Sequence, residues 1–126
     1  EQLVDLRLQL SGNHLGDQGG KLLAGAFNRM QRLAVLRLDL NRSHFSEHGW
    51  TCLTACISSM GRLTDLHLNV GGCKMGDQAC KLLADGLSRM PRLASLHLQL
   101  GGNKLSDNCC KYLAESIGSL KQLAAL

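Results

Sequence analysis

The feature that most constrains this sequence is a segment that recurs every thirty residues without an insertion or a deletion. Its copies begin at Leu3, Leu33, Leu63 and Leu93, and a shorter fifth copy begins at Leu123. Self-similarity at a fixed period of this size is typical of a solenoid, in which each unit packs against its neighbours. We therefore expect a single domain over residues 1–126, with repeats at 3–32, 33–62, 63–92 and 93–122 and a partial strand at 123–126.

Each copy changes its hydrophobic period halfway along. Leu6, Leu8 and Leu10 alternate with polar residues, and a period of two predicts a strand with one buried face. The second half spaces its apolar residues as one stripe of a helix does, for example at Leu53 and Ile57. Helices are therefore expected at 17–29, 47–59, 77–89 and 107–119.

Composition limits what the core contains. Aromatic residues make up only 3% of the chain, so the core is expected to consist of leucine rather than of large rings. The formal net charge of +4 is too small to indicate a nucleic-acid partner by itself. No apolar run approaches the roughly 18 residues that a transmembrane helix needs.

The repeat resembles a leucine-rich repeat, whose signature is Leu-x-x-Leu-x-Leu-x-x-Asn/Cys-x-Leu. Leu93, Leu96 and Leu98 carry the first part of it, and Asn103 and Leu105 carry the second. The long helical half is similar to the ribonuclease-inhibitor-like subclass. The resemblance implies an α/β solenoid, a horseshoe with a parallel sheet on the concave face and α-helices on the convex face. It also implies a scaffold that binds proteins.

This sequence departs from the signature in one place. Two extra residues, including Leu10, lie between the Leu8 column and the Asn13 column. Either a longer strand or a widened turn after the strand would accommodate them.

One polar column closes each copy and is expected to be structural. An amide both donates and accepts hydrogen bonds, so asparagine here suits a ladder between neighbouring coils, whereas serine does part of this and cysteine does it weakly. The column consists of Asn13, Ser43, Cys73 and Asn103.

The cysteines and histidines give no pattern for catalysis or a metal. The chain has six cysteines, and none has the Cys-x-x-Cys spacing of a zinc or redox site. Cys80 and Cys110 share a column, but buried thiols at packing positions explain all six, and reduced thiols fit a cytoplasmic protein. We therefore expect six free cysteines, no metal, no cofactor, no small-molecule substrate and no enzymatic activity.

The solvent-facing strand positions form the candidate binding surface on the concave face. Their charges are mixed, and Asp5, Asp39 and Asp65 flank the arginines, which suits a protein surface of mixed charge. The face lacks aromatic rings, so it is a poor nucleic-acid platform. The candidate residues are Asp5, Arg7, Gln9, Arg37, Asp39, Asp65, His67, Asn69, Ser95, His97 and Gln99.

Two further columns are basic. Arg32, Arg62 and Arg92 precede the strands. The second column follows the turns and consists of His14, His44, Lys74 and Lys104. Solvated charge is the ordinary explanation for such columns, and an acidic partner or RNA is the more specific one.

Taken together, these patterns favour a non-catalytic protein–protein interaction or scaffold module within a larger assembly. Two alternatives stay open at this point. One is a regulatory recognition domain of an innate sensor or a GTPase activator, and the other is a basic module that binds RNA or a membrane surface. We also expect a fragment of a longer array, whose first coil would expose Leu6, Leu8, Leu23 and Phe27.

Overall fold

A computed structural model describes residues 3–124 of the chain. Four strands alternate with four helices, so the predicted α/β repeat is confirmed. In chain order the elements are β1 (Asp5–Gln9), α1 (Asp17–Asn28), β2 (Val35–Asp39), α2 (Glu47–Ser58), β3 (Asp65–Asn69), α3 (Asp77–Leu87), β4 (Ser95–Gln99) and α4 (Asp107–Gly118).

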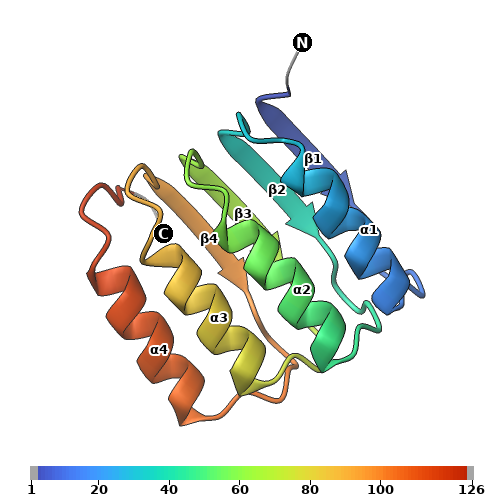
Figure 1. Cartoon of the computed structure of the whole chain (residues 1–126). Helices are drawn as coiled ribbons and strands as arrows, with labels where there is room; N and C mark the ends of the chain where they lie inside the picture. The colour runs from blue at the N-terminus through green and yellow to red at the C-terminus, as the bar shows by residue number, and fades with distance from the viewer. Residues whose placement is uncertain (1–2, 125–126) are drawn as a thin grey trace.

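The strands form one parallel sheet in the order β1-β2-β3-β4. Equivalent positions of the repeat pair with each other throughout, for example Leu6 with Leu36, Leu36 with Leu66, and Leu66 with Leu96. All four helices lie on the same side of this sheet, side by side and in the same order as the strands (Figure 1). We call the side of the sheet away from the helices the concave face.

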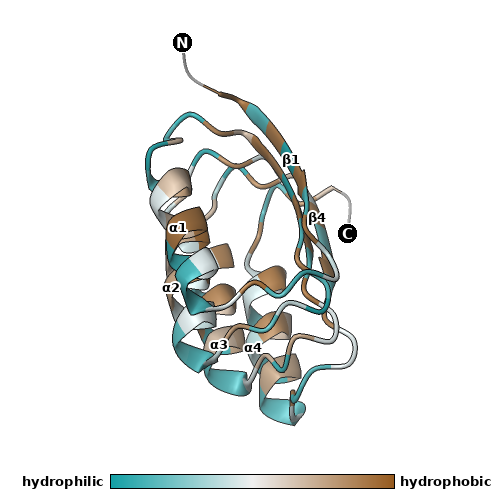
Figure 2. Ribbon diagram, turned by 90° about the vertical axis from the view of Figure 1, so that its right-hand side faces the viewer, coloured by the Kyte–Doolittle hydropathy of each residue, from teal (hydrophilic) through white to brown (hydrophobic). Residues whose placement is uncertain are grey.

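The core is the layer between the sheet and the helices, where the hydrophobic surfaces of both meet (Figure 2). Leu36, Leu38, Leu66 and Leu68 are at most 1% exposed, and the polar residues between them are half-buried. This alternation confirms the strand faces that the period of two predicted. The predicted helical stripes also lie in this core or pack against it.

The expectation of a core without large rings is wrong. Trp50 and Phe27 are each 1% exposed, and the ring of Phe45 meets the Trp50 ring edge-on at 4.8 Å. The Trp50 indole donates a hydrogen bond to the carbonyl of Cys73, 3.2 Å away, so its one polar atom has a partner inside the core. Phe27 is therefore not part of an exposed first coil, whereas Leu6, Leu8 and Leu23 are half-buried.

The two extra residues of each repeat lie in the turn that follows the strand. The strands end at the Gln9 column, but hydrogen bonds between coils continue beyond them. Leu10 donates to the carbonyl of Asp39 and Gly12 donates to the carbonyl of Asn41, both at 2.8 Å, and the later coils repeat both bonds. The extra residues thus form a widened turn whose backbone groups stay paired between coils.

Neighbouring coils are also joined where their helices begin. The Asp17 carboxylate of α1 accepts hydrogen bonds from the backbone amide and the hydroxyl of Ser46, the residue that caps α2. Asp77 of α3 accepts the same two bonds from Ser106, which caps α4. These bonds hold the starts of adjacent helices together.

The predicted partial strand at 123–126 falls partly outside the described residues. The backbone of Leu123 and Ala124 is not assigned to a strand. The Ala124 amide nevertheless donates to the carbonyl of Ala94 at 2.7 Å, which continues the pattern of bonds that precedes each earlier strand.

Candidate functional site

The structure places all eleven predicted binding residues on the four strands of the sheet. They occupy three columns that run across the strands, because equivalent repeat positions pair in register. These columns are Asp5–Val35–Asp65–Ser95, Arg7–Arg37–His67–His97 and Gln9–Asp39–Asn69–Gln99. The predicted residues are therefore brought together on the concave face.

The middle column is the basic one. Arg7, Arg37, His67 and His97 stand on adjacent parallel strands, whose spacing is about 4.8 Å. The rings of His67 and His97 stack with their centroids 4.2 Å apart and their planes 16° from parallel. Both rings keep access to solvent, since His67 is half-buried and His97 is exposed.

Aspartates in the first column partly neutralise the arginines. Asp5 lies 3.7 Å from Nε of Arg7, and Asp65 lies 3.4 Å from an Nη atom of Arg37. Both contacts are long, and the side chains are between a quarter and three-fifths exposed, so each pair contributes little to stability. The arginines thus remain able to bind another anion.

Two predicted binding residues in the third column bond to their own turns. An Asp39 carboxylate oxygen accepts from the amide of Asn41 at 3.0 Å. The Asn69 side-chain oxygen likewise accepts from the amide of Gly71 at 3.1 Å. Each side chain therefore shapes the widened turn after its strand, in addition to lying on the concave face.

The pKa of His67 lies below its ordinary value of 6.5. Partial burial is the main cause, because it disfavours the charged imidazolium form. His97 and Arg37 lower the pKa further, and Asp65 and Asp39 oppose them. Gln99 adds a polar contact, with its amide nitrogen 3.3 Å from Nε2 of His97.

A shallow hollow opens over the first three strands. Its volume is about 490 Å³. Two arginines and one histidine contribute basic groups, and Asp39 contributes an acidic one. The lining residues are Arg7, Leu8, Gln9, Arg37, Leu38, Asp39 and His67. A side chain of a partner could enter such a hollow, whose basic groups outnumber its acidic ones.

The predicted turn ladder is present but uneven. The Asn103 oxygen accepts from the amides of Cys73 and Met75, and its amide donates to the carbonyls of Val70 and Leu100. Asn103 therefore makes four hydrogen bonds, and three of them join its coil to the preceding one. All of them are between 2.8 and 3.0 Å.

The other members of this column make fewer bonds. The Cys73 thiol donates to the carbonyl of Leu40 in the preceding coil, at 3.0 Å, and the Asn13 amide donates to the carbonyl of Leu10. Within residues 3–124, nothing accepts from or donates to the buried Ser43 hydroxyl. The expectation that cysteine makes weaker hydrogen bonds than serine in this column is therefore wrong, because the Cys73 thiol has a partner and the Ser43 hydroxyl has none in the described residues.

The expectation of six free cysteines is wrong. Cys80 of α3 and Cys109 of α4 form a disulfide, with their Cα atoms 5.9 Å apart. Within the described part of the chain, Cys52, Cys56, Cys73 and Cys110 remain thiols. Burial raises the pKa of the Cys56 and Cys73 thiols, so both are poor nucleophiles.

The repeat columns do not predict this bond, because they align Cys80 with Cys110. Cys80 and Cys110 share a column, but the bonded residues are 29 positions apart rather than thirty. The packing of α3 against α4 brings position 109 rather than 110 against Cys80. The pair of adjacent cysteines at 109 and 110 was the only signal for it in the sequence.

Within residues 3–124, no three side chains of histidine, cysteine, aspartate or glutamate gather as metal ligands would. None of the helices in the same residues combines the length and hydropathy that crossing a bilayer demands.

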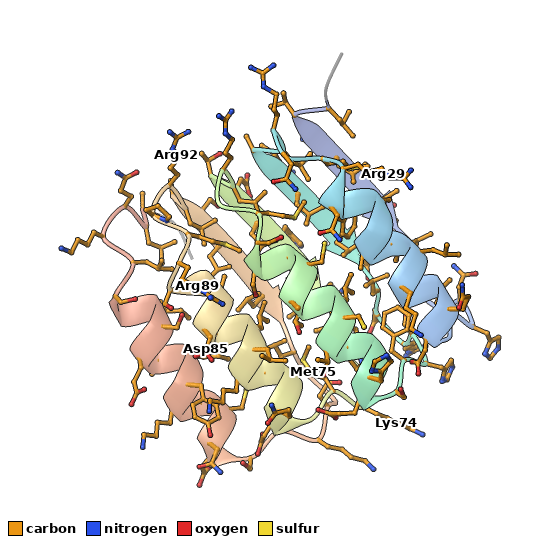
Figure 3. All side chains as sticks on the ribbon, in the orientation of Figure 1. Arg29, Lys74, Met75, Asp85, Arg89 and Arg92 are labelled. Carbon is orange, nitrogen blue, oxygen red and sulfur yellow. A yellow bond between two sulfur atoms is a disulfide. The ribbon has the colours of Figure 1, made fainter. Side chains whose placement is uncertain are left out.

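The basic columns lie at the two ends of the strands. Arg92 lies just before β4 and Lys74 lies beyond the turn that follows β3, at opposite edges of the molecule (Figure 3). His14 and His44 stack in the second column, with centroids 5.0 Å apart. The basic columns are thus separated by the length of the concave face rather than joined into one patch.

Comparison with protein families finds a match in the first repeat. Residues 6–24, which cover the first strand and most of the first helix, match the family model described as "Leucine Rich repeat". A search of curated proteins finds no significant match.

Proposed function

We propose that this chain, whose residues 6–24 match a leucine-rich repeat model and whose β–α units recur four times in the described residues, is a non-catalytic protein–protein interaction module that binds its partner on the concave face. The observation that carries this proposal is the in-register array of hydrogen-bonding side chains on four adjacent strands. The helices cover only the other side of the sheet, so this face is available to a partner (Figure 1). The hollow over β1–β3 adds a place for an inserted side chain.

The charge pattern favours a protein over a nucleic acid. Asp5, Asp39 and Asp65 flank the basic middle column, so the face offers no continuous basic surface to a long run of phosphates. A protein surface offers carboxylates, amides and cations at separate points, which matches such a face.

A basic binder of RNA or of membrane surfaces is the second candidate. The two basic columns favour it. Arg32, Arg62 and Arg92 share one position of the repeat, and Lys74 and Lys104 share another. The labelled members Arg92 and Lys74 lie at opposite edges of the molecule (Figure 3). Their separation across the molecule weakens this candidate, because one polyanion would have to span the whole face.

Finer assignments also belong to this proposal. The helices of 11 or 12 residues in each unit support the ribonuclease-inhibitor-like subclass. A cytoplasmic location stays a prediction, and the Cys80–Cys109 disulfide argues against it, because such bonds persist mainly in oxidising compartments. Alkylation of thiols in intact cells, followed by mass spectrometry of Cys80 and Cys109, would decide between the two environments.

The test of the proposed function reverses charges on the concave face without removing an ion pair. Arg37→Asp combined with Asp65→Arg exchanges the two partners of one contact, so the folded chain should keep its stability. Proteins recovered from a cell lysate by the wild type should be lost with this double variant. The matched control is Lys21→Glu with Lys111→Glu, which changes exposed charges on α1 and α4. Loss with the control and retention with the concave variant would place binding on the helices instead.

A further inference from the structure

We infer that Arg37, His67 and His97 form a docking point for a carboxylate on an acidic segment of a protein partner, and that this contact tightens as the stacked histidines take up a proton. The inference rests on the proposed function, since it names the partner chemistry and the control of that same concave face. It depends on the geometry of three adjacent side chains.

The three side chains lie side by side because the register of the sheet pairs their strand positions. Arg37 on β2 lies beside His67 on β3, and His67 lies beside His97 on β4. The arginine is already in contact with Asp65, but that contact is 3.4 Å long and uses only one of its donor atoms. An incoming carboxylate can therefore bind at the arginine without displacing a strong partner.

The stacked rings supply the dependence on pH. In the free protein two imidazolium charges would face each other at a centroid distance of 4.2 Å, with the Arg37 cation beside them. Partial burial lowers the pKa of His67, and the charges of His97 and Arg37 lower it further. A carboxylate placed against the rings would offset this repulsion, so its binding would stabilise the imidazolium form.

The charged groups around His67 determine how far a bound carboxylate can raise its pKa. Arg37 and Asp39 face it from β2, Asp65 lies on its own strand, and His97 faces it from β4. The two aspartates already favour protonation, yet the pKa of His67 still lies below the ordinary value. A bound carboxylate adds a third negative group and raises that pKa. By linkage, affinity is then highest below the free-state pKa and falls as the pH rises through the value in the complex.

The other pair of stacked histidines provides a matched control. His14 and His44 stack at 5.0 Å in the basic column after the turns, where they are exposed and stand on no strand of the sheet. They form the same kind of stacked ring pair but are not paired with Arg37 in the sheet. A general increase in positive charge at low pH would act through both pairs, whereas a docking point acts through His67 and His97 alone.

The experiment measures binding of a fluorescein-labelled hexa-aspartate peptide to the whole chain by anisotropy, at about pH 5.5 and about pH 7.5 and constant ionic strength. The aspartates stay ionised at both values, because their ordinary pKa is about 3.9. We expect affinity to be several-fold higher at the lower pH, up to about tenfold, which is the limit that a change of about one unit in a single linked pKa allows. His67→Gln and His97→Gln should each remove most of that difference, and Arg37→Gln should weaken binding at both pH values. His44→Gln and Lys111→Gln should change neither result.

Several outcomes would overturn the inference. Equal affinity at the two pH values, no binding of the peptide, or an equal effect of His44→Gln and His67→Gln would each do so. Tighter binding of a hexanucleotide RNA that also depends on Arg37 would assign the site to nucleic acid instead. The proposed function is tested by a separate result. It predicts only that a protein captured by the wild type is lost with the Arg37→Asp/Asp65→Arg variant.

Discussion

Gly86 of α3 packs directly against Ser58 of α2, and a Cβ atom added at position 86 would lie 2.8 Å from the Cα of Ser58. The Ser58 hydroxyl donates hydrogen bonds to the carbonyls of Thr54 and Leu82, so it links the same two helices. This close approach brings the backbones of α2 and α3 together at the centre of the solenoid. A side chain at position 86 would therefore change the spacing of the repeats.

Gly86→Ala should destabilise the protein by roughly 1–3 kcal/mol, because the added methyl group meets Cβ and Cα of Ser58, which a rotamer change cannot move away. Gly25→Ala in α1 is the matched control, since nothing within 4 Å of the added Cβ lies among the described residues. The control should stabilise the protein by about 0.5–1 kcal/mol through helix propensity. Urea unfolding of the two variants measures both changes, and a shift of the same sign in both would contradict this account of the contact.

Asn103→Ala should be the most damaging substitution in the turn ladder. It leaves the amides of Cys73 and Met75 and the carbonyls of Val70 and Leu100 without their side-chain partner. Unsatisfied buried groups cost about 1–3 kcal/mol each, and partial hydration lowers the sum, so we expect a loss on the order of 3 kcal/mol.

Asn13→Ala provides the comparison, because it removes a single exposed hydrogen bond to the Leu10 carbonyl. The loss there should stay below about 1 kcal/mol. Thermal unfolding of the two variants side by side tests the difference. Equal losses would show that the column stabilises each coil separately and does not depend on bonds between coils.

The Cys80–Cys109 disulfide should stabilise α4 against α3. Closing a loop with a sequence separation of 29 residues restricts the unfolded chain, which is worth about 3–4 kcal/mol in the chain-entropy account. Reduction, or the variant Cys109→Ser, should lower the denaturant midpoint accordingly, whereas Cys110→Ser should not. Thiol titration of the denatured protein should find four reactive groups without reductant and six with it. Six reactive thiols in both conditions would contradict the bond.

Repetition explains why much of the fold could be predicted from the sequence. The period of two at Leu36 and Leu38 and the helical stripe at Leu53 and Ile57 each recur in every unit, so errors at one copy are corrected by the others. The predicted helix starts agree with the structure, whereas the predicted ends are one or two residues too long. Residues such as Arg29 keep helical backbone angles as C-caps, which a hydrophobic pattern cannot distinguish from the last turn.

Details that depend on the offset between coils could not be predicted. The stack of His67 on His97 is an exception, because it follows from register alone: the two rings occupy the same repeat position on adjacent strands. The partner of Cys80 depends instead on how far one helix is rotated relative to the next. A polar side chain at the end of a strand, such as Asp39, can point to solvent or bond to its own turn, and the pattern is the same in both cases. The repeat columns therefore predict where the candidate site lies, but they do not predict the contacts within it.

Asp17 and Asp77 should both titrate below the ordinary value of 3.8 for aspartate. The hydroxyl of Ser46 lowers the pKa of Asp17 most, followed by its amide, and Ser106 acts on Asp77 in the same way. A carboxylate with a lowered pKa stabilises the folded state fully above the unfolded-state value. That contribution is lost as the pH falls through the folded-state value.

Side-chain NMR titration of the two carboxyl groups provides the measurement. Ser46→Ala should raise the pKa of Asp17 toward 3.8 and leave that of Asp77 in place, and Ser106→Ala should do the reverse. Each variant thus serves as the control for the other. A change in both aspartates with either variant would indicate that the effect is not local to one pair of coils.

Arg42 stands where three other repeats have glycine, and it has the left-handed backbone angle that glycine favours. Its φ is 61°, close to the values of 74°, 64° and 72° at Gly12, Gly72 and Gly102. A side chain in this conformation costs on the order of 1 kcal/mol, partly offset by the lower entropy of arginine in the unfolded chain. Arg42→Gly should therefore stabilise the protein by up to about 1 kcal/mol.

The reciprocal change measures the free-energy cost of the left-handed backbone conformation alone. At Gly12 an added Cβ meets nothing within 4 Å among the described residues, so Gly12→Ala introduces the strained conformation without a clash. It should destabilise the protein by about 1 kcal/mol, opposite in sign to Arg42→Gly. Denaturant midpoints of the two variants test the pair. If Arg42→Gly instead lowers the midpoint, the contacts of the arginine side chain stabilise the protein by more than its backbone conformation costs.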